Sequence, residues 1–145
     1  MARALATIGY EQATQAAVID KLRAAGVEVL IDVRAVAASR RAGFSKTILA
    51  NSLAEHGIDY VHLRALGTPK AGREAARHGR INEMHQIFEQ QLETPEAQLQ
   101  LAQAAEIASG RKAALLCFEA DHARCHREII ASRLAKSHGF KIDNL

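Results

Sequence analysis

Hydrophobic residues recur along the chain in two patterns that alternate with each other. Short, nearly continuous apolar runs are typical of buried β-strands. Longer segments with apolar residues three or four positions apart are typical of amphipathic helices. The first pattern predicts strands over residues 5–8, 27–31, 58–63, 114–119 and 140–142. The second predicts helices over residues 11–25, 46–56, 81–92, 95–109 and 125–138.

Residues that start and stop helices mark the ends of these segments. Ser45 and Thr94 are placed to cap the helices that follow them. Gly26 follows another predicted helix, where glycine favours termination. Residues 35–43 and 64–80 lack a clear periodicity, and the second segment carries three glycines, a proline and several arginines. We expect residues 64–80 to be a long basic loop, and loops of this length often have a function.

The alternation of strands with helices predicts the fold class. Such alternation is typical of parallel βαβ units with right-handed crossovers. With 145 residues, the chain is most simply a single α/β domain that covers residues 1–145. We expect a mostly parallel sheet of about five strands with helices on both faces.

The composition limits the cellular setting. No apolar run approaches the roughly 20 residues that a membrane-spanning helix needs, so we expect no membrane association. The apolar part of the N-terminus is too short for a secretory signal. Two cysteines in a chain of this size do not make a disulfide scaffold, so a reducing cytoplasm is the expected location.

The net charge of +3 is distributed unevenly. Residues 34–80 contain nine Lys or Arg and three Asp or Glu, whereas residues 81–110 contain five Glu and no Lys or Arg. The basic segment is suited to binding an anionic small molecule or a nucleic acid. The alternative is that these basic residues only keep the protein soluble. The chain has no tryptophan and few aromatic residues, so base stacking is not favoured as a binding mode.

Polar residues follow the predicted strand over residues 27–31. In parallel sheets ligands bind at the carboxyl ends of the strands, so these residues are candidates for a site. Asp32 and Arg34 lie two positions apart and therefore point to the same face. They are predicted either to form a structural ion pair or to bind a substrate, with Arg34 holding a phosphate or carboxylate. Ser39 and Arg40 in the following loop are expected to contribute to the same pocket.

Both cysteines, a glutamate, two histidines and two arginines fall within residues 117–127. Cys125 is a candidate nucleophile, because a helix N-terminus and neighbouring basic groups favour the thiolate. His126 is a candidate acid or base, and Arg127 is a candidate anion ligand. A buried structural role is the alternative for each of the three.

The end of the predicted strand over residues 114–119 contributes two further candidates. Core packing is the expected role of Cys117, and contact with a substrate is the alternative. Glu119 lies two positions on, at the same face of the strand. It is predicted either to act as a general base or to form an ion pair with Arg124 or Arg127.

Known site templates do not match this region. A cysteine-phosphatase loop has an arginine at a fixed distance from its cysteine, and this chain has Ala123 and Ala131 at the corresponding positions. The chain has no CxxC pair and no obvious fourth ligand to join the two cysteines and a histidine, so no metal and no cofactor are expected. Redox pairing of the two cysteines is a further alternative, and their spacing neither favours nor excludes it.

Several short segments together resemble a known family. They are Thr7-Ile8-Gly9, Asp32-Val33-Arg34, Ser39-Arg40, residues 57–61, Leu66-Gly67, Cys117-Phe118-Glu119 and Cys125-His126-Arg127. Their order and spacing are similar to those of the family known as domain of unknown function 488, over nearly the whole chain. The resemblance implies a small α/β domain of bacterial and archaeal proteins and assigns no reaction.

The chain departs from the pattern of this family at four positions. The family tends to have a histidine and a small hydroxyl residue where this chain has Tyr10 and Glu11. It often has proline at Ala37 and favours a second glycine at Thr68. The first departure removes a polar residue that a reaction in this family could use.

These observations favour an enzyme that hydrolyses, or transfers a group from, a phosphorylated or nucleotide substrate. The alternatives are a non-catalytic nucleic-acid or nucleotide-binding module, and an interaction domain whose polar cluster is structural. The oligomeric state is not predicted. The predicted catalytic residues are Cys125, His126, Asp32 and Glu119. The predicted substrate-binding residues are Arg34, Ser39, Arg40, Arg127 and Cys117.

Overall fold

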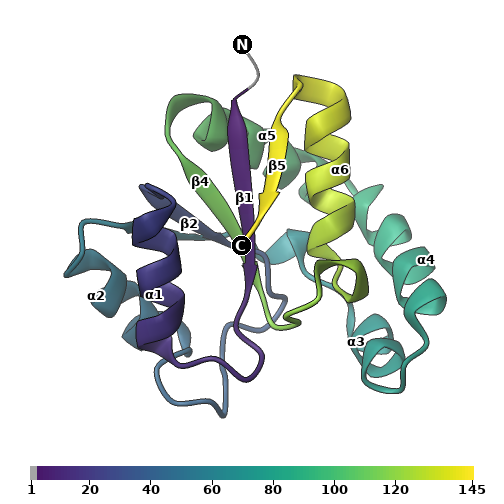
Figure 1. Cartoon of the computed structure of the whole chain (residues 1–145). Helices are drawn as coiled ribbons and strands as arrows, with labels where there is room; N and C mark the ends of the chain where they lie inside the picture. Colours follow the sequence, from purple (N-terminus) through teal and green to yellow (C-terminus); the bar gives the residue numbers. More distant parts are fainter. Residues whose placement is uncertain (1–2) are drawn as a thin grey trace.

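Five parallel strands form one sheet in the order β3-β2-β4-β1-β5 (Figure 1). The structure is a computed structural model that describes residues 3–145. The predicted α/β class and the number of strands are confirmed, and the sheet is parallel throughout. The strands are β1 (Ala4–Gly9), β2 (Val29–Asp32), β3 (Asp59–His62), β4 (Ala113–Cys117) and β5 (Lys141–Asn144).

Six α-helices and two short 3-10 helices connect the strands within residues 3–145. None of these helices has the length and hydrophobicity needed to span a bilayer. The 3-10 helices are η1 (Arg64–Leu66) and η2 (His122–Arg124). The α-helices are α1 (Gln15–Ala24), α2 (Lys46–Ala54), α3 (Lys70–Arg77), α4 (Ile81–Leu92), α5 (Pro95–Gly110) and α6 (Arg127–His138).

The helix caps agree with the sequence analysis in one case and differ in another. Thr94 caps α5 as predicted, because its hydroxyl accepts a hydrogen bond from the backbone N–H of Ala97 at 3.3 Å. Ser45 precedes α2, but its hydroxyl does not bond to that helix. It donates instead to the carbonyl of Ser39 at 3.2 Å and accepts from the N–H of Ser39 at 3.0 Å.

Side chains of the strands alternate between two hydrophobic cores, one on each face of the sheet. In β4, Leu115 packs in the core that α4, α5 and α6 cover, whereas Leu116 packs in the core that α1 and α2 cover. Figure 1 shows α1 and α2 on one side of the sheet and α6 on the other. Helices therefore cover both faces, as predicted. The polar residues at the strand ends also point alternately to one face of the sheet and to the other.

Several predicted boundaries differ from the structure: α1 begins at Gln15 and not at residue 11, and β4 ends at Cys117, so Glu119 lies in the loop after the strand. Residues 64–80, predicted as a loop, contain η1 and α3. Gly72 lowers the intrinsic helix propensity of this segment, and packing of α3 against α4 compensates for it. The helix predicted to begin at residue 125 begins at Arg127, and Cys125 instead directly follows η2.

The connections that follow β2 and β4 leave the sheet in opposite directions. The chain continues from β2 to β3 at one edge of the sheet, and from β4 to β5 at the other edge. Between adjacent parallel strands, such a reversal creates a crevice at their carboxyl ends. Asp32 ends β2 and Cys117 ends β4, so both predicted site segments start at this crevice.

Candidate functional site

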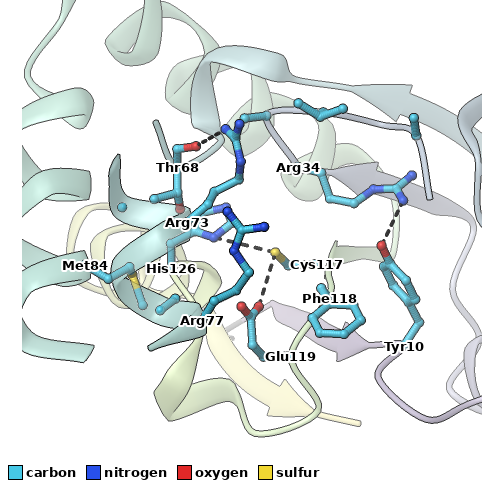
Figure 2. Close-up of a pocket in the computed structure, with 15 residues that line it drawn as sticks. Tyr10, Arg34, Thr68, Arg73, Arg77, Met84, Cys117, Phe118, Glu119 and His126 are labelled. Atoms are coloured by element: carbon cyan, nitrogen blue, oxygen red, sulfur yellow. Dashed lines mark hydrogen bonds between the residues drawn. The ribbon is translucent and has the colours of Figure 1, made fainter. Parts of the chain in front are cut away.

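A cavity of about 330 Å³ lies at the carboxyl ends of β2 and β4 (Figure 2). Its walls come from the loop after β2, from α3, and from the segment between β4 and α6. In Figure 2, the guanidinium of Arg77 lies beside Cys117, Glu119 and His126, whereas that of Arg73 points toward the carbonyl of Thr68. The volume is within the range of small-molecule sites, roughly 300–1,000 Å³.

The two cysteine thiols lie around one histidine ring. His126 Nδ1 is 3.5 Å from Cys117 Sγ and 3.8 Å from Cys125 Sγ. The other ring nitrogen, Nε2, is 2.7 Å from the carbonyl oxygen of Val33. A carbonyl oxygen only accepts hydrogen bonds, so Nε2 carries a hydrogen and donates it. The structure therefore brings the end of β4, the residues before α6 and the segment after β2 together.

The neighbours of the two thiols move their pKa values in opposite directions. Burial alone would raise the pKa of Cys125, but the hydrogen bond from Cys117 and the charge of His126 lower it well below the usual value. The pKa of Cys117 is raised, first by its hydrogen bond to Cys125 and then by burial. Of the two thiols, Cys125 is therefore the more acidic. Cys125 is fully buried and does not line the cavity, whereas Cys117 does.

Glu119 reaches the cavity from the loop after β4. Its Oε2 is 3.7 Å from Cys117 Sγ. Burial, followed by the nearby charge of Cys125, raises the pKa of Glu119 to about 7. For His126, burial alone would lower the pKa, and the charge of Cys125 reverses that direction and raises it. These four groups therefore titrate together as one cluster.

Asp32 and Arg34 form the ion pair that their spacing predicts. Arg34 Nη2 donates to Asp32 Oδ2 at 2.7 Å, and its Nε donates to Asp32 Oδ1 at 2.9 Å. Its Nη1 donates to the hydroxyl of Tyr10 at 3.1 Å and to the carbonyl of Phe44 at 2.8 Å. Burial alone would lower the pKa of Arg34, and the hydrogen bond and charge of Asp32 reverse this. Arg34 borders the cavity, but each of its guanidinium nitrogens already has a protein partner.

Arg127 lies behind the cavity and is only 1% exposed. It donates to the carbonyl of Glu119 at 2.5 Å and to the carbonyl of Ala120 at 3.3 Å. The structure therefore does not bring Arg127 and Arg34 to a common anion site. Through these two bonds Arg127 holds the loop that carries Glu119.

The two predicted residues of the loop after β2 lie outside the cavity lining. Ser39 is bonded to Ser45 as described above, and its hydroxyl accepts from the N–H of Arg41 at 3.1 Å. These bonds shape the loop, and Arg40 is exposed on it. Neither Ser39 nor Arg40 is among the residues that line the cavity.

Sequence reasoning did not single out Arg73 and Arg77. They lie four residues apart and therefore share one face of α3. Arg73 Nη1 donates to the carbonyl of Thr68 at 2.9 Å, and the side chain of Arg77 makes no ion pair within residues 3–145. The spacing of four could have placed both arginines on one helix face. It was not used, because residues 64–80 were predicted to be a loop.

The fold and the cavity define a parallel α/β protein with a candidate ligand site at the carboxyl edge of its sheet. The chain belongs to the family described as Domain of unknown function DUF488, which matches residues 14–134. The resemblance noted in the sequence is therefore confirmed. The matched range includes Arg73, Arg77 and the segment from Cys117 to Arg127. Comparisons with curated proteins and with solved structures find no match.

Proposed function

We propose that the protein is an enzyme that binds a small phosphorylated molecule, such as a nucleotide, in this cavity and hydrolyses it or transfers a group from it. One observation carries the proposal. The guanidinium of Arg77 lies beside Cys117, Glu119 and His126, and Arg73, whose guanidinium is turned toward the carbonyl of Thr68, lines the same cavity (Figure 2). Positive charge on one wall and acid–base and thiol groups on the other suit a substrate with an anionic group beside its reacting bond.

The binding half of the proposal depends on free arginine donors. A guanidinium group binds phosphate through two parallel hydrogen bonds, and it stays charged at any physiological pH. Arg73 uses one nitrogen for the carbonyl of Thr68, which fixes its direction and leaves other donors available. Arg77 is exposed and has no carboxylate partner within residues 3–145. Arg34 contributes positive charge at the border of the cavity, while its donors remain with Asp32, Tyr10 and Phe44.

The residues on the floor of the cavity would carry out the reaction. Of the predicted catalytic residues, His126 and Glu119 line the cavity directly. Cys125 lies beneath them against His126, and Asp32 acts only by holding Arg34. Cys117, predicted as a binding residue, is the thiol that faces the substrate. We place this chemistry in the cytoplasm, because a reducing compartment preserves both free thiols.

Calorimetric titration of the full chain with inorganic phosphate and with nucleoside monophosphates tests the proposal. We expect binding that weakens at least about tenfold in Arg77→Gln and in Arg73→Gln, which is about 1.4 kcal/mol and is typical of one lost hydrogen bond to a charged group. Arg23→Gln, an exposed arginine on α1, is the matched control and is expected to bind as the wild type does. Phosphate release from a panel of phosphorylated compounds tests turnover.

Two results would count against this function. Unchanged affinity in both cavity variants would show that the anion binds elsewhere. Tight binding of an oligonucleotide, with a steep dependence on salt and no binding of mononucleotides, would support the nucleic-acid module instead.

A further inference from the structure

Three metal-binding side chains meet at the floor of the cavity. Cys117 ends β4, Cys125 follows η2, and His126 precedes α6. Their donor atoms, two Sγ and one Nδ1, all lie within 4.8 Å of one another, and the three residues are buried. Soft thiolate ligands together with an imidazole are the donor set that zinc prefers.

The spacing of these donors matches a tetrahedral centre. Zinc–sulfur bonds of about 2.3 Å and zinc–nitrogen bonds of about 2.0–2.1 Å at tetrahedral angles separate sulfur from nitrogen by about 3.6 Å. The observed distances from His126 Nδ1 to Cys117 Sγ and to Cys125 Sγ are 3.5 and 3.8 Å. A metal ion therefore fits between the donors with small side-chain movements.

The orientation of the histidine ring is also that of a metal ligand. Metal-binding histidines usually donate the hydrogen of their other ring nitrogen to a carboxylate or a backbone carbonyl. His126 does this through Nε2, which donates to the carbonyl of Val33 at 2.7 Å. Phe88 packs edge-on against the ring, with the ring centroids 4.8 Å apart. Both contacts hold Nδ1 toward the two sulfur atoms.

The charge around the cluster favours thiolates. Arg127 is almost fully buried, and no carboxylate of residues 3–145 forms an ion pair with it. Its bonds go to two backbone carbonyls, so its positive charge faces the cluster without a carboxylate to neutralise it. Two thiolates balance the charge of a divalent cation, and the buried Arg127 then leaves one positive charge beside the site.

We propose that Cys117, Cys125 and His126 bind one divalent metal ion of the zinc type, with the fourth coordination position open to the cavity. Cys117 and His126 line the cavity, and the carboxylate of Glu119 lies 3.7 Å from Cys117 Sγ on the same side. Three protein ligands and one open position are the arrangement of catalytic zinc sites. The ion replaces the protons that the thiols and Nδ1 hold, and these protons go to solvent.

This inference goes beyond the phosphate-binding proposal and does not depend on it. The sequence analysis expected no metal because no fourth protein ligand was apparent. With the proposed site the missing ligand is explained, since Cys117 and His126 line the cavity and a fourth position there needs no protein ligand. A bound substrate oxygen or a water molecule would occupy it.

Titration of the reduced, metal-free full chain with cobalt(II) tests the site. We expect one cobalt ion per chain, with thiolate-to-metal charge-transfer bands and the visible bands of tetrahedral cobalt, and displacement by zinc. Cys117→Ser, Cys125→Ser and His126→Gln are each expected to weaken binding at least about tenfold, the lower end of the loss seen for residues outside the first coordination shell. His122→Gln is the matched control, since His122 is 40% exposed and contacts Glu128.

The wild-type protein provides a second readout if a variant does not fold. Zinc is expected to raise its melting temperature, and a chelator is expected to reverse the rise. No cobalt complex together with no effect of zinc on melting overturns the metal site. Formation of a Cys117–Cys125 disulfide by a peroxide in protein that binds no metal also overturns it, in favour of a redox pair. Arg77→Gln is expected to keep the cobalt spectrum, so failure of the metal site and failure of anion binding are distinguishable.

Discussion

At the scale of single residues, the buried ion pair of Asp32 and Arg34 is the most consequential polar contact. The carboxylate is fully buried and accepts from Arg34 and from the hydroxyl of Tyr60. The spacing of two along a strand predicted this pair as one of two alternatives, the other being substrate binding by Arg34. The sequence did not identify Tyr10 and Phe44 as the other partners of Arg34, because they come from segments that only the fold brings close.

Asp32→Asn is expected to lower the free energy of unfolding by about 3–5 kcal/mol, because it leaves the buried guanidinium of Arg34 without its counter-charge. Urea denaturation measures the change. Asp59→Asn is the matched control: its ion pair with Arg111 is largely exposed, with side-chain accessibilities of 67% and 41%. That variant is expected to lose less than about 1 kcal/mol. Equal losses in the two variants would show that the buried pair is not stabilising.

Tyr60 gives an alkaline prediction at the same scale. Burial and then its hydrogen bond to Asp32 raise the pKa of this hydroxyl above its ordinary value of 10.0. The folded chain therefore holds the proton more tightly than the unfolded chain, so the contribution to stability is full below about pH 10 and falls as the pH rises further. We expect the stability advantage of the wild type over Tyr60→Phe to shrink above pH 10. Urea midpoints across the alkaline range measure it, and an advantage that is constant with pH would contradict it.

At the scale of elements, α3 is the segment that the sequence analysis misjudged. Three glycines and a proline in residues 64–80 indicate a loop by local propensity. The structure forms a helix there because α3 packs against α4, and Gly72 is the point of close approach. A Cβ at Gly72 would overlap Thr68 Cγ2 and lie 3.3 Å from Ile87 Cγ2. The helix therefore depends on tertiary contacts, and so does the placement of Arg73 and Arg77.

The substitution Gly72→Ala distinguishes the effect of local helix propensity from the effect of packing against α4. Helix propensity alone predicts a gain of about 1 kcal/mol in stability. The crowding against Thr68 and Ile87 predicts a loss of about 1–3 kcal/mol, as for other overpacked sites. We expect a loss, together with weaker phosphate binding, measured by urea denaturation and calorimetry.

Gly110→Ala is the control for this prediction. A Cβ at Gly110 meets no atom within 4 Å, so this variant at the end of α5 is expected to be neutral or stabilising. A stabilised Gly72→Ala protein with normal phosphate binding would show that the packing of α3 does not position the two arginines.

At the scale of the whole molecule, the alternation of side chains across the sheet sorts the polar residues into two groups. Leu30 of β2 packs in the core that α1 and α2 cover, and Asp32, two positions on, points to that same face. Cys117 packs in the opposite core, which α4, α5 and α6 cover. The ion pair thus supports one side of the crevice, while the thiols and His126 form the floor on the other. The connections that diverge after β2 and β4 leave the cavity open between them.

The sequence by itself determined the parallel α/β class and marked residues 117–127 as a candidate site, because both inferences depend on periodicities and neighbours a few positions apart. Only the tertiary structure decided which charges reach the cavity. Arg127 turns to backbone carbonyls, and Arg34 is held by partners from other segments. The half-buried Arg73 and the exposed Arg77 line the cavity instead, because α3 forms only where it packs. A charged side chain points where burial and hydrogen bonding are satisfied, and those conditions exist only after distant segments have met.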